Sequence, residues 1–143
     1  MKKIIILLSS LVATILFMLG CSSEDIKDFN IEEIAINEAR KIASEQGYTL
    51  KSETFNESML GDSEIFEFMK NASIEGGYSE DNFDSDSDRT YVDYELVEKS
   101  KLDLPITLGL IIDTENGKVT GAYLDHSGYS PGIEPINFKD NFK

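Results

Sequence analysis

The sequence predicts an α+β fold, in which one or two N-terminal helices pack on an antiparallel sheet of three to four strands that ends in a hairpin. Three observations lead to this expectation. Between Asn30 and Gly47 the apolar residues recur at helical spacing. After residue 89 apolar and polar residues alternate, which is typical of half-buried strands. Near the end, Asn116-Gly117 is the pair of residues most characteristic of a tight turn between two strands.

The first helix is predicted to follow Asn30. The side chain of Asn30 can accept a hydrogen bond from Glu33, as in a capping box, and Gly47 stands where a helix-ending glycine belongs. Two glutamates in the first turn and a basic pair further on follow the order that the helix dipole favours. The apolar face of this helix consists of Ile31, Ile34, Ala35, Ala39, Ile42 and Ala43.

Two weaker elements are predicted after the first helix. Residues 48–55, YTLKSETF, alternate well enough to form a strand. A shorter helix is predicted from Asp62 or Ser63 to Asn71, and Gly76-Gly77 stops it. The apolar side of this second helix consists of Ile65, Phe66, Met69 and Ala72.

The last part of the chain is predicted to form strands with one apolar face. On the first strand that face consists of Thr90, Val92, Tyr94 and Leu96. On the second it consists of Leu108, Leu110 and Ile112. A two-residue turn at Asn116-Gly117 pairs Ile112 with Gly121 and Leu110 with Tyr123, so Tyr123 is expected on this same apolar face. The tail from Ser127 to Pro135 is rich in Gly and Pro and is expected to be irregular.

Residues 79–88, SEDNFDSDSD, are acidic and poor in apolar groups, which predicts a mobile loop. The first, third and fifth places of an EF-hand calcium loop are occupied by Asp84, Asp86 and Asp88. Glu95 stands at the twelfth place, but Arg89 replaces the glycine at the sixth, and a strand is predicted where the EF-hand has a helix. We therefore expect a solvated acidic segment. The alternative hypothesis is a calcium-responsive structural or sensor protein that uses this segment.

No catalytic site is predicted. His126 is the only histidine and lies between Asp125 and Ser127, but neighbours on a strand point in different directions, and a triad depends on geometry. His126 is therefore expected to be a surface residue at the end of a strand. Nothing in the sequence resembles a nucleophile elbow, an H-E-x-x-H helix or a phosphate loop. We expect a protein without enzymatic activity, cofactor or metal site.

The first twenty residues have the layout of an export signal. Met1-Lys2-Lys3 is followed by an uncharged, largely apolar run from Ile4 to Leu19, and then by Gly20 and Cys21. The apolar run is shorter than the roughly 20 residues that span a bilayer as a helix. Cys21 is the only cysteine, so a disulfide within the chain has no partner, and a thiolate or zinc site lacks histidine and cysteine neighbours.

The segment LFMLGCSS resembles the lipobox of bacterial lipoproteins, and this resemblance covers residues 1 to 22. It implies that residues 1–20 are a lipoprotein signal peptide, that Cys21 carries a lipid, and that the protein is anchored in the cell membrane and faces outside the cytoplasm. The alternatives are a plain signal peptide and a retained anchor. Residues 21–30 then form a lipidated tether, and residues 31–143 a single α+β domain with its acidic loop near 79–88.

The net charge of −14 excludes one class of partner. Loss of residues 1–20 removes two lysines and no acid, which leaves 11 basic against 27 acidic residues, a net charge of −16. Such a surface repels nucleic acid and anionic lipid headgroups, so nucleic-acid binding and polybasic docking on membranes are excluded. A protein partner outside the cytoplasm remains.

The order of the elements resembles PepSY-type domains over about residues 31 to 125. The residues that carry the resemblance are Ala35, Ala39, Ala43 and Gly47 in the helix, and Ile112, Asp113, Gly117, Lys118 and Val119 in the hairpin. The layout is also similar to small Gram-positive lipoproteins. The PepSY resemblance implies a non-enzymatic module that binds or restrains a protein partner. We expect its contact surface at a sheet edge or in the region of Tyr123, Tyr129 and Pro131.

Overall fold

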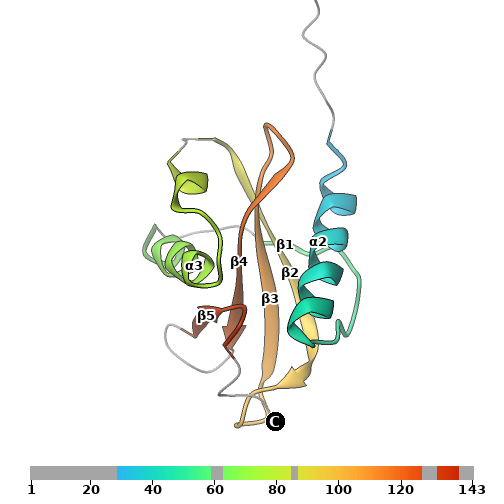
Figure 1. Ribbon diagram of the computed structural model, residues 1–143. Coiled ribbons are helices and arrows are strands. Elements are labelled where there is room, and N and C mark those ends of the chain that lie inside the picture. Colours follow the sequence, from blue (N-terminus) through green and yellow to red (C-terminus); the bar gives the residue numbers. More distant parts are fainter. Residues whose placement is uncertain (1–28, 59–62, 85–86, 127–131, 139–143) are drawn as a thin grey trace, which may run out of the picture.

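Five antiparallel strands form one sheet whose order in space is the order of the strands in the chain (Figure 1). The computed structural model describes residues 29–58, 63–84, 87–126 and 132–138. Its elements are α2 (Ile31–Gln46), β1 (Glu57–Ser58), α3 (Ser63–Glu75), the 3-10 helix η1 (Glu80–Phe83), β2 (Arg89–Lys99), β3 (Pro105–Asp113), β4 (Lys118–His126) and β5 (Ile133–Pro135). The predicted α+β class is confirmed, and the short strands β1 and β5 extend the sheet at its two edges.

The two helices cover opposite faces of the sheet (Figure 1). Alternate residues of the long strands point to opposite sides. Val92, Leu110 and Leu124 pack with the small residues of α2, whereas Ile111 and Tyr123 pack with α3. The predicted apolar face is therefore the α2 side, and α3 covers a second, smaller core on the other side.

The predicted limits and buried face of α2 are confirmed. The carboxamide oxygen of Asn30 accepts a hydrogen bond from the backbone nitrogen of Glu33 at 3.2 Å. Gly47 ends the helix in the left-handed conformation, with φ +74°, which a residue without Cβ adopts at no steric cost. The buried residues of α2 are Ala35, Ala39, Ile42 and Ala43.

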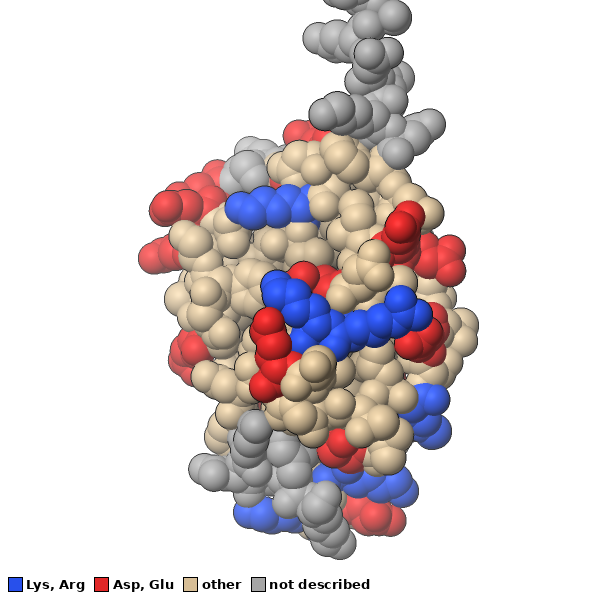
Figure 2. Space-filling model, turned by 45° about the vertical axis from the view of Figure 1, so that its right-hand side comes forward, with Lys and Arg blue, Asp and Glu red and all other residues tan. Residues whose placement is uncertain are grey.

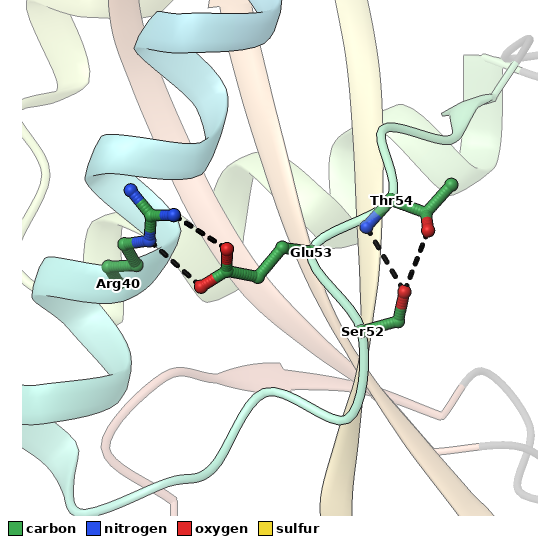
Figure 3. Close-up of polar contacts among 4 residues, drawn as sticks. All are labelled: Arg40, Ser52, Glu53 and Thr54. Atoms are coloured by element: carbon green, nitrogen blue, oxygen red, sulfur yellow. Dashed lines mark hydrogen bonds and ion pairs between the residues drawn. The ribbon is translucent and has the colours of Figure 1, made fainter.

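The prediction of a strand at residues 48–55 is wrong. Only Leu50 forms a bridge, with Leu96 of β2. Beyond it the hydroxyl of Ser52 accepts a hydrogen bond from the backbone nitrogen of Thr54 at 3.1 Å, a local turn that competes with strand pairing (Figure 3). The segment is held on α2 by a bidentate ion pair, in which the Arg40 guanidinium donates to both carboxylate oxygens of Glu53 at 2.9 and 2.6 Å (Figure 3).

The acidic segment is only partly as predicted. Residues 80–83 form η1, and Phe83 is buried in the core beneath α3. Asn82 fastens η1 to β4, because its amide donates to the carbonyl of Thr120 at 3.2 Å and its carbonyl accepts from Lys118 at 2.6 Å. The prediction of a mobile loop is therefore wrong for residues 80–83. Burial of the Phe83 ring stabilises an ordered conformation there despite the acidic composition. Residues 85 and 86 lie outside the described residues.

The register of the β3–β4 hairpin differs from the prediction. Ile112 pairs with Val119, and Leu110 pairs with Ala122, because the turn spans residues 114–117 and β4 has a bulge at Thr120. The turn is longer because the Asp113 carboxylate accepts hydrogen bonds from the backbone nitrogens of Glu115, at 2.9 Å, and Asn116, at 3.2 Å. The shift turns Tyr123 to the α3 side of the sheet.

The tail is also more regular than predicted. Ile133–Pro135 form β5, which pairs with β4 at the edge of the sheet. The residue that follows, Ile136, is buried in the core on the α2 side. Residues 127–131 lie outside the described residues. A three-residue strand that ends in proline has no alternation long enough to predict.

Candidate functional site

The predicted lipidation site, Cys21, lies outside the described residues, as do residues 1–20 and most of the tether. Lipidation therefore stays a prediction. Among the described helices, none has both the length and the hydropathy that a membrane span requires.

The acidic segment does not have the geometry of an EF-hand. Asp84 and Asp88 are exposed, and Asp86 lies outside the described residues. Glu95 lies on β2, about 20 Å along an extended strand from Arg89 at ~3.3 Å per residue. Glu95 is also paired with Lys51, whose ammonium lies 2.6 Å from its carboxylate. Within the described part of the chain, no three His, Cys, Asp or Glu side chains converge as ligands for a metal ion.

His126 is buried, so the prediction of a surface histidine is wrong. Its side chain is only 2% exposed, and its ring meets that of Phe138 edge to face, with the centroids 6.4 Å apart. The backbone nitrogen of His126 donates to the carbonyl of Gly132 at 2.8 Å, so the chain folds back over it. Burial lowers the pKa of His126. The covering residues could not be anticipated from a tail that looked irregular.

Of the two predicted contact surfaces, a sheet edge stays a prediction, and in the other Tyr123 is buried. Tyr123 is 1% exposed, and its ring lies over Gly109, where an added Cβ would be 2.2 Å from the ring. Burial raises the pKa of Tyr123, and the charges of Asp93 and Asp125 raise it further. Tyr129 and Pro131 lie outside the described residues. Tyr123 is a core residue.

A cavity of about 280 Å³ opens at the C-terminal end of α2. One wall is a single stripe of α2, made of Glu38, Lys41, Ile42, Glu45 and Gln46. The other wall is made of Gly76, Gly77, Tyr78 and Ile136. Although α3 packs on the opposite face of the sheet, Tyr78 packs against the core on the α2 side, so the chain after α3 reaches across to close the cavity.

The polar groups of the cavity meet at Glu38. Its carboxylate accepts a hydrogen bond from the ammonium of Lys41 at 3.1 Å and another from the hydroxyl of Tyr78 at 3.4 Å. Tyr78 is held in place through its backbone nitrogen, which donates to the carbonyl of Ser73 at 3.0 Å. Gly77 permits this return of the chain with φ +107°, a conformation that other residues rarely adopt.

The potential in the cavity is negative. Burial raises the pKa of Tyr78, and the charges of Glu38 and Glu45 raise it further. The hydrogen bond and charge of Glu38 raise the pKa of Lys41, and the charge of Glu45 adds to this. Glu45 lies in the last turn of α2, which carries no basic residue there. The negative end of the helix dipole therefore adds to the carboxylates instead of opposing them.

The sequence analysis missed this site. Apart from Ile42, its α2 residues looked like the solvated face of a helix, and Tyr78 and Ile136 join them only in three dimensions. One signal was present in the sequence. Glu45 is an acid in the last turn before Gly47, where the helix dipole favours a base. Together with Glu38, seven positions earlier on the same stripe, it could have identified an acidic patch at a helix end.

No protein-family model, curated protein or solved structure matches this chain. The resemblances to bacterial lipoproteins and to PepSY-type domains stay predictions.

Proposed function

We propose that this chain is a lipoprotein of the cell membrane, anchored outside the cytoplasm by lipid on Cys21, whose domain is a non-enzymatic binding or inhibitory module. The observation that carries the binding role is the cavity at the end of α2, where an acidic stripe faces Tyr78 across an open space. Ligand sites in proteins are concave and combine apolar walls with a few convergent polar groups. The partner is a protein outside the cytoplasm.

The groups in the cavity favour recognition over reaction. Glu38 is hydrogen-bonded to both Lys41 and Tyr78, which fixes the position of its carboxylate. Tyr78 has a raised pKa and therefore keeps its proton near neutral pH. A fixed carboxylate and a protonated phenol present a stable pattern of charge and hydrogen bonding to a ligand.

The position of the anchor supports the same role. Phe29, the first described residue, lies against the tip of the β3–β4 hairpin, because a Cβ added to Gly117 would be 2.5 Å from its ring. The residues of α2 that line the cavity run from Glu38 to Gln46, about 10 to 23 Å from Ile31 along a helix that rises ~1.5 Å per residue. In Figure 1 the N-terminal end of α2 lies toward the tip of the β3–β4 hairpin, and the C-terminal end lies away from that tip. A lipid-anchored chain would therefore present the cavity away from its tether.

The charged surface around α2 also suits a selective partner. Three ion pairs on this side join Arg40 with Glu53, Lys41 with Glu38, and Lys51 with Glu95. Figure 2 shows two basic side chains next to each other at the centre of this face, with acidic side chains beside them. Since the chain as a whole is strongly acidic, the net field favours a basic partner.

Metabolic labelling with a palmitate analogue tests the anchor. Cells that express the chain should incorporate label into it, and Cys21→Ser should lose the label and move to the soluble fraction. Retention of label by Cys21→Ser would refute lipidation at this position. Capture of cell-surface proteins with the full chain tests the binding role, and the absence of any specifically retained protein would contradict it.

A further inference from the structure

We propose that the cavity at the end of α2 binds one cationic side chain, a lysine or an arginine, of a basic protein partner. The inference rests on the proposed binding function, because it names the chemistry of the partner that the same site recognises. It follows from the charges of the cavity, its place at a helix end and the nature of its walls.

The charges in the cavity are unbalanced. The lining carries two carboxylates, on Glu38 and Glu45, against one ammonium, on Lys41. That ammonium is bound to Glu38, 3.1 Å away, so the charge of Glu45 is left without a hydrogen-bonded cation among the described contacts of the cavity. Burial raises the pKa of Tyr78, and the hydrogen bond to Glu38 raises that of Lys41. In both cases the charges of Glu38 and Glu45 raise the pKa further, so a further positive charge is attracted here.

The end of α2 adds to this attraction. The last turn of a helix carries partial negative charge on its carbonyl groups, and cations stabilise it. Glu45 lies in that turn, and no basic residue of α2 does. An acid in this place lowers the stability of the isolated domain, because its charge is repelled by the negative end of the helix dipole. A bound cation would be attracted both by the acid and by that end of the helix. Residues that break a local rule of stability are found at functional sites.

The walls fit the stem of a long basic side chain. Ile42 and Ile136 line the cavity but are only 2% and 6% exposed. The ring of Tyr78 is therefore the main apolar surface for the stem, and it can lie beside an ammonium or guanidinium as a cation–π partner. Gly76 packs closely on Ile136 in this wall, since an added Cβ would lie only 3.1 Å from that side chain. The volume of about 280 Å³ suits one side chain of a partner, not a large ligand.

Titration of the ¹⁵N-labelled full chain in nonionic micelles tests the inference. The probes are the N-acetyl amides of lysine and arginine, with that of norleucine as the uncharged control. Saturable shifts in the amide resonances of residues 38–46 and 76–78 are expected with both cations and absent with norleucine. Spermidine is a second control, and binding of spermidine in preference to a short lysine peptide would overturn the assignment to a protein side chain.

Three variants are expected to weaken lysine binding, to leave it unchanged and to tighten it, respectively. The double variant Glu38→Gln with Glu45→Gln should weaken lysine binding at least tenfold, whereas Glu67→Gln, an exposed acid on α3, should leave it unchanged. Lys41→Met should tighten binding several-fold, because it removes the cation that competes for Glu38. A purely structural role of Lys41 predicts no such gain.

The outcomes separate this inference from the proposed function. If neither cation gives saturable shifts at the cavity, or if the double variant binds lysine as well as the unaltered chain, the inference is overturned. A captured surface protein that the double variant retains equally would overturn it too, while leaving the binding role standing. Lysine binding that follows the variants supports the inference even if Cys21→Ser keeps its label and the anchor is refuted.

Discussion

At its N-terminal end α2 has the features that stabilise a helix start, whereas at its C-terminal end one charge opposes the helix dipole. Asn30 caps the first turn, and Glu32 and Glu33 face the positive end of the dipole. At the other end Gly47 closes the helix well, but Glu45 stands where a cation belongs. The first end is next to the tether and the second is next to the cavity. The comparison indicates that the N-terminal end of α2 is optimised for stability and that the end at the cavity is not.

The largest expected effect distinguishes two glycines, one near each end. Gly117, with φ +67°, has the ring of Phe29 where its Cβ would be, whereas Gly47, with φ +74°, has open space. Gly117→Ala should lower the free energy of unfolding by about 2–4 kcal/mol, from backbone strain and overlap together. Gly47→Ala should lower it by only about 1–2 kcal/mol, from strain alone. Denaturant unfolding measures both, and equal losses would contradict the close packing of Phe29 on the hairpin tip.

Loss of the cap is the next effect in size. Asn30→Ala removes the acceptor for the backbone nitrogen of Glu33 and should lower the free energy of unfolding by about 1 kcal/mol. Asn30→Asp should keep most of the stability, because aspartate also caps a helix and its charge favours the dipole. A fall in melting temperature with both variants would show that the capping geometry is not the source of the stability.

Glu45→Gln should act in the opposite direction. Removing an acid from the last turn should raise the free energy of unfolding by about 0.3–1 kcal/mol. The matched change at the other end, Glu32→Gln, should lower it by a similar amount. Added salt should reduce both effects. Destabilisation by Glu45→Gln would mean that the carboxylate is needed for the fold, and the contrast between the two ends would fail.

The smallest expected effect is that of calcium. The acidic segment borders the hairpin near the first end, where the carbonyl of Asp88 accepts hydrogen bonds from the backbone and hydroxyl of Thr114. Because β2 carries Glu95 far from Asp84, no EF-hand shell can close. Millimolar calcium should leave the melting temperature of the full chain where EDTA leaves it. A rise of several degrees that depends on Asp84 would revive the alternative of a calcium-responsive protein.

The sequence predicted the elements that depend on local periodicity. The limits of α2 and the alternating faces of β2 and β3 follow from side chains that repeat over a long stretch. The prediction of the hairpin register is wrong because the carboxylate of Asp113 stabilises a longer turn and β4 has a bulge at Thr120. The longer turn shifts the pairing by two residues and the bulge shifts it back by one. The net shift of one residue is enough to bury Tyr123 on the unexpected side of the sheet.

The cavity depends on contacts that no local pattern contains. Tyr78 follows a helix on the far side of the sheet, and Ile136 follows a strand of three residues. Sequence reasoning placed Glu38 and Glu45 on a helix but had no means to show what faces them. The helix dipole was the single clue, because an acid in the last turn of a helix lowers its stability and therefore calls for an explanation.

The edges of the sheet have a consequence for a chain that the proposed lipid would hold at a membrane. An exposed strand edge can pair with the same edge of another copy, and anchoring on a membrane brings copies together. At one edge β1 has only two residues, and residues 49–51 bond to β2 beside it. At the other edge β5 is three residues long and ends in Pro135, which has no hydrogen to donate. Short, interrupted edges of this kind would let many copies share a membrane without joining into aggregates.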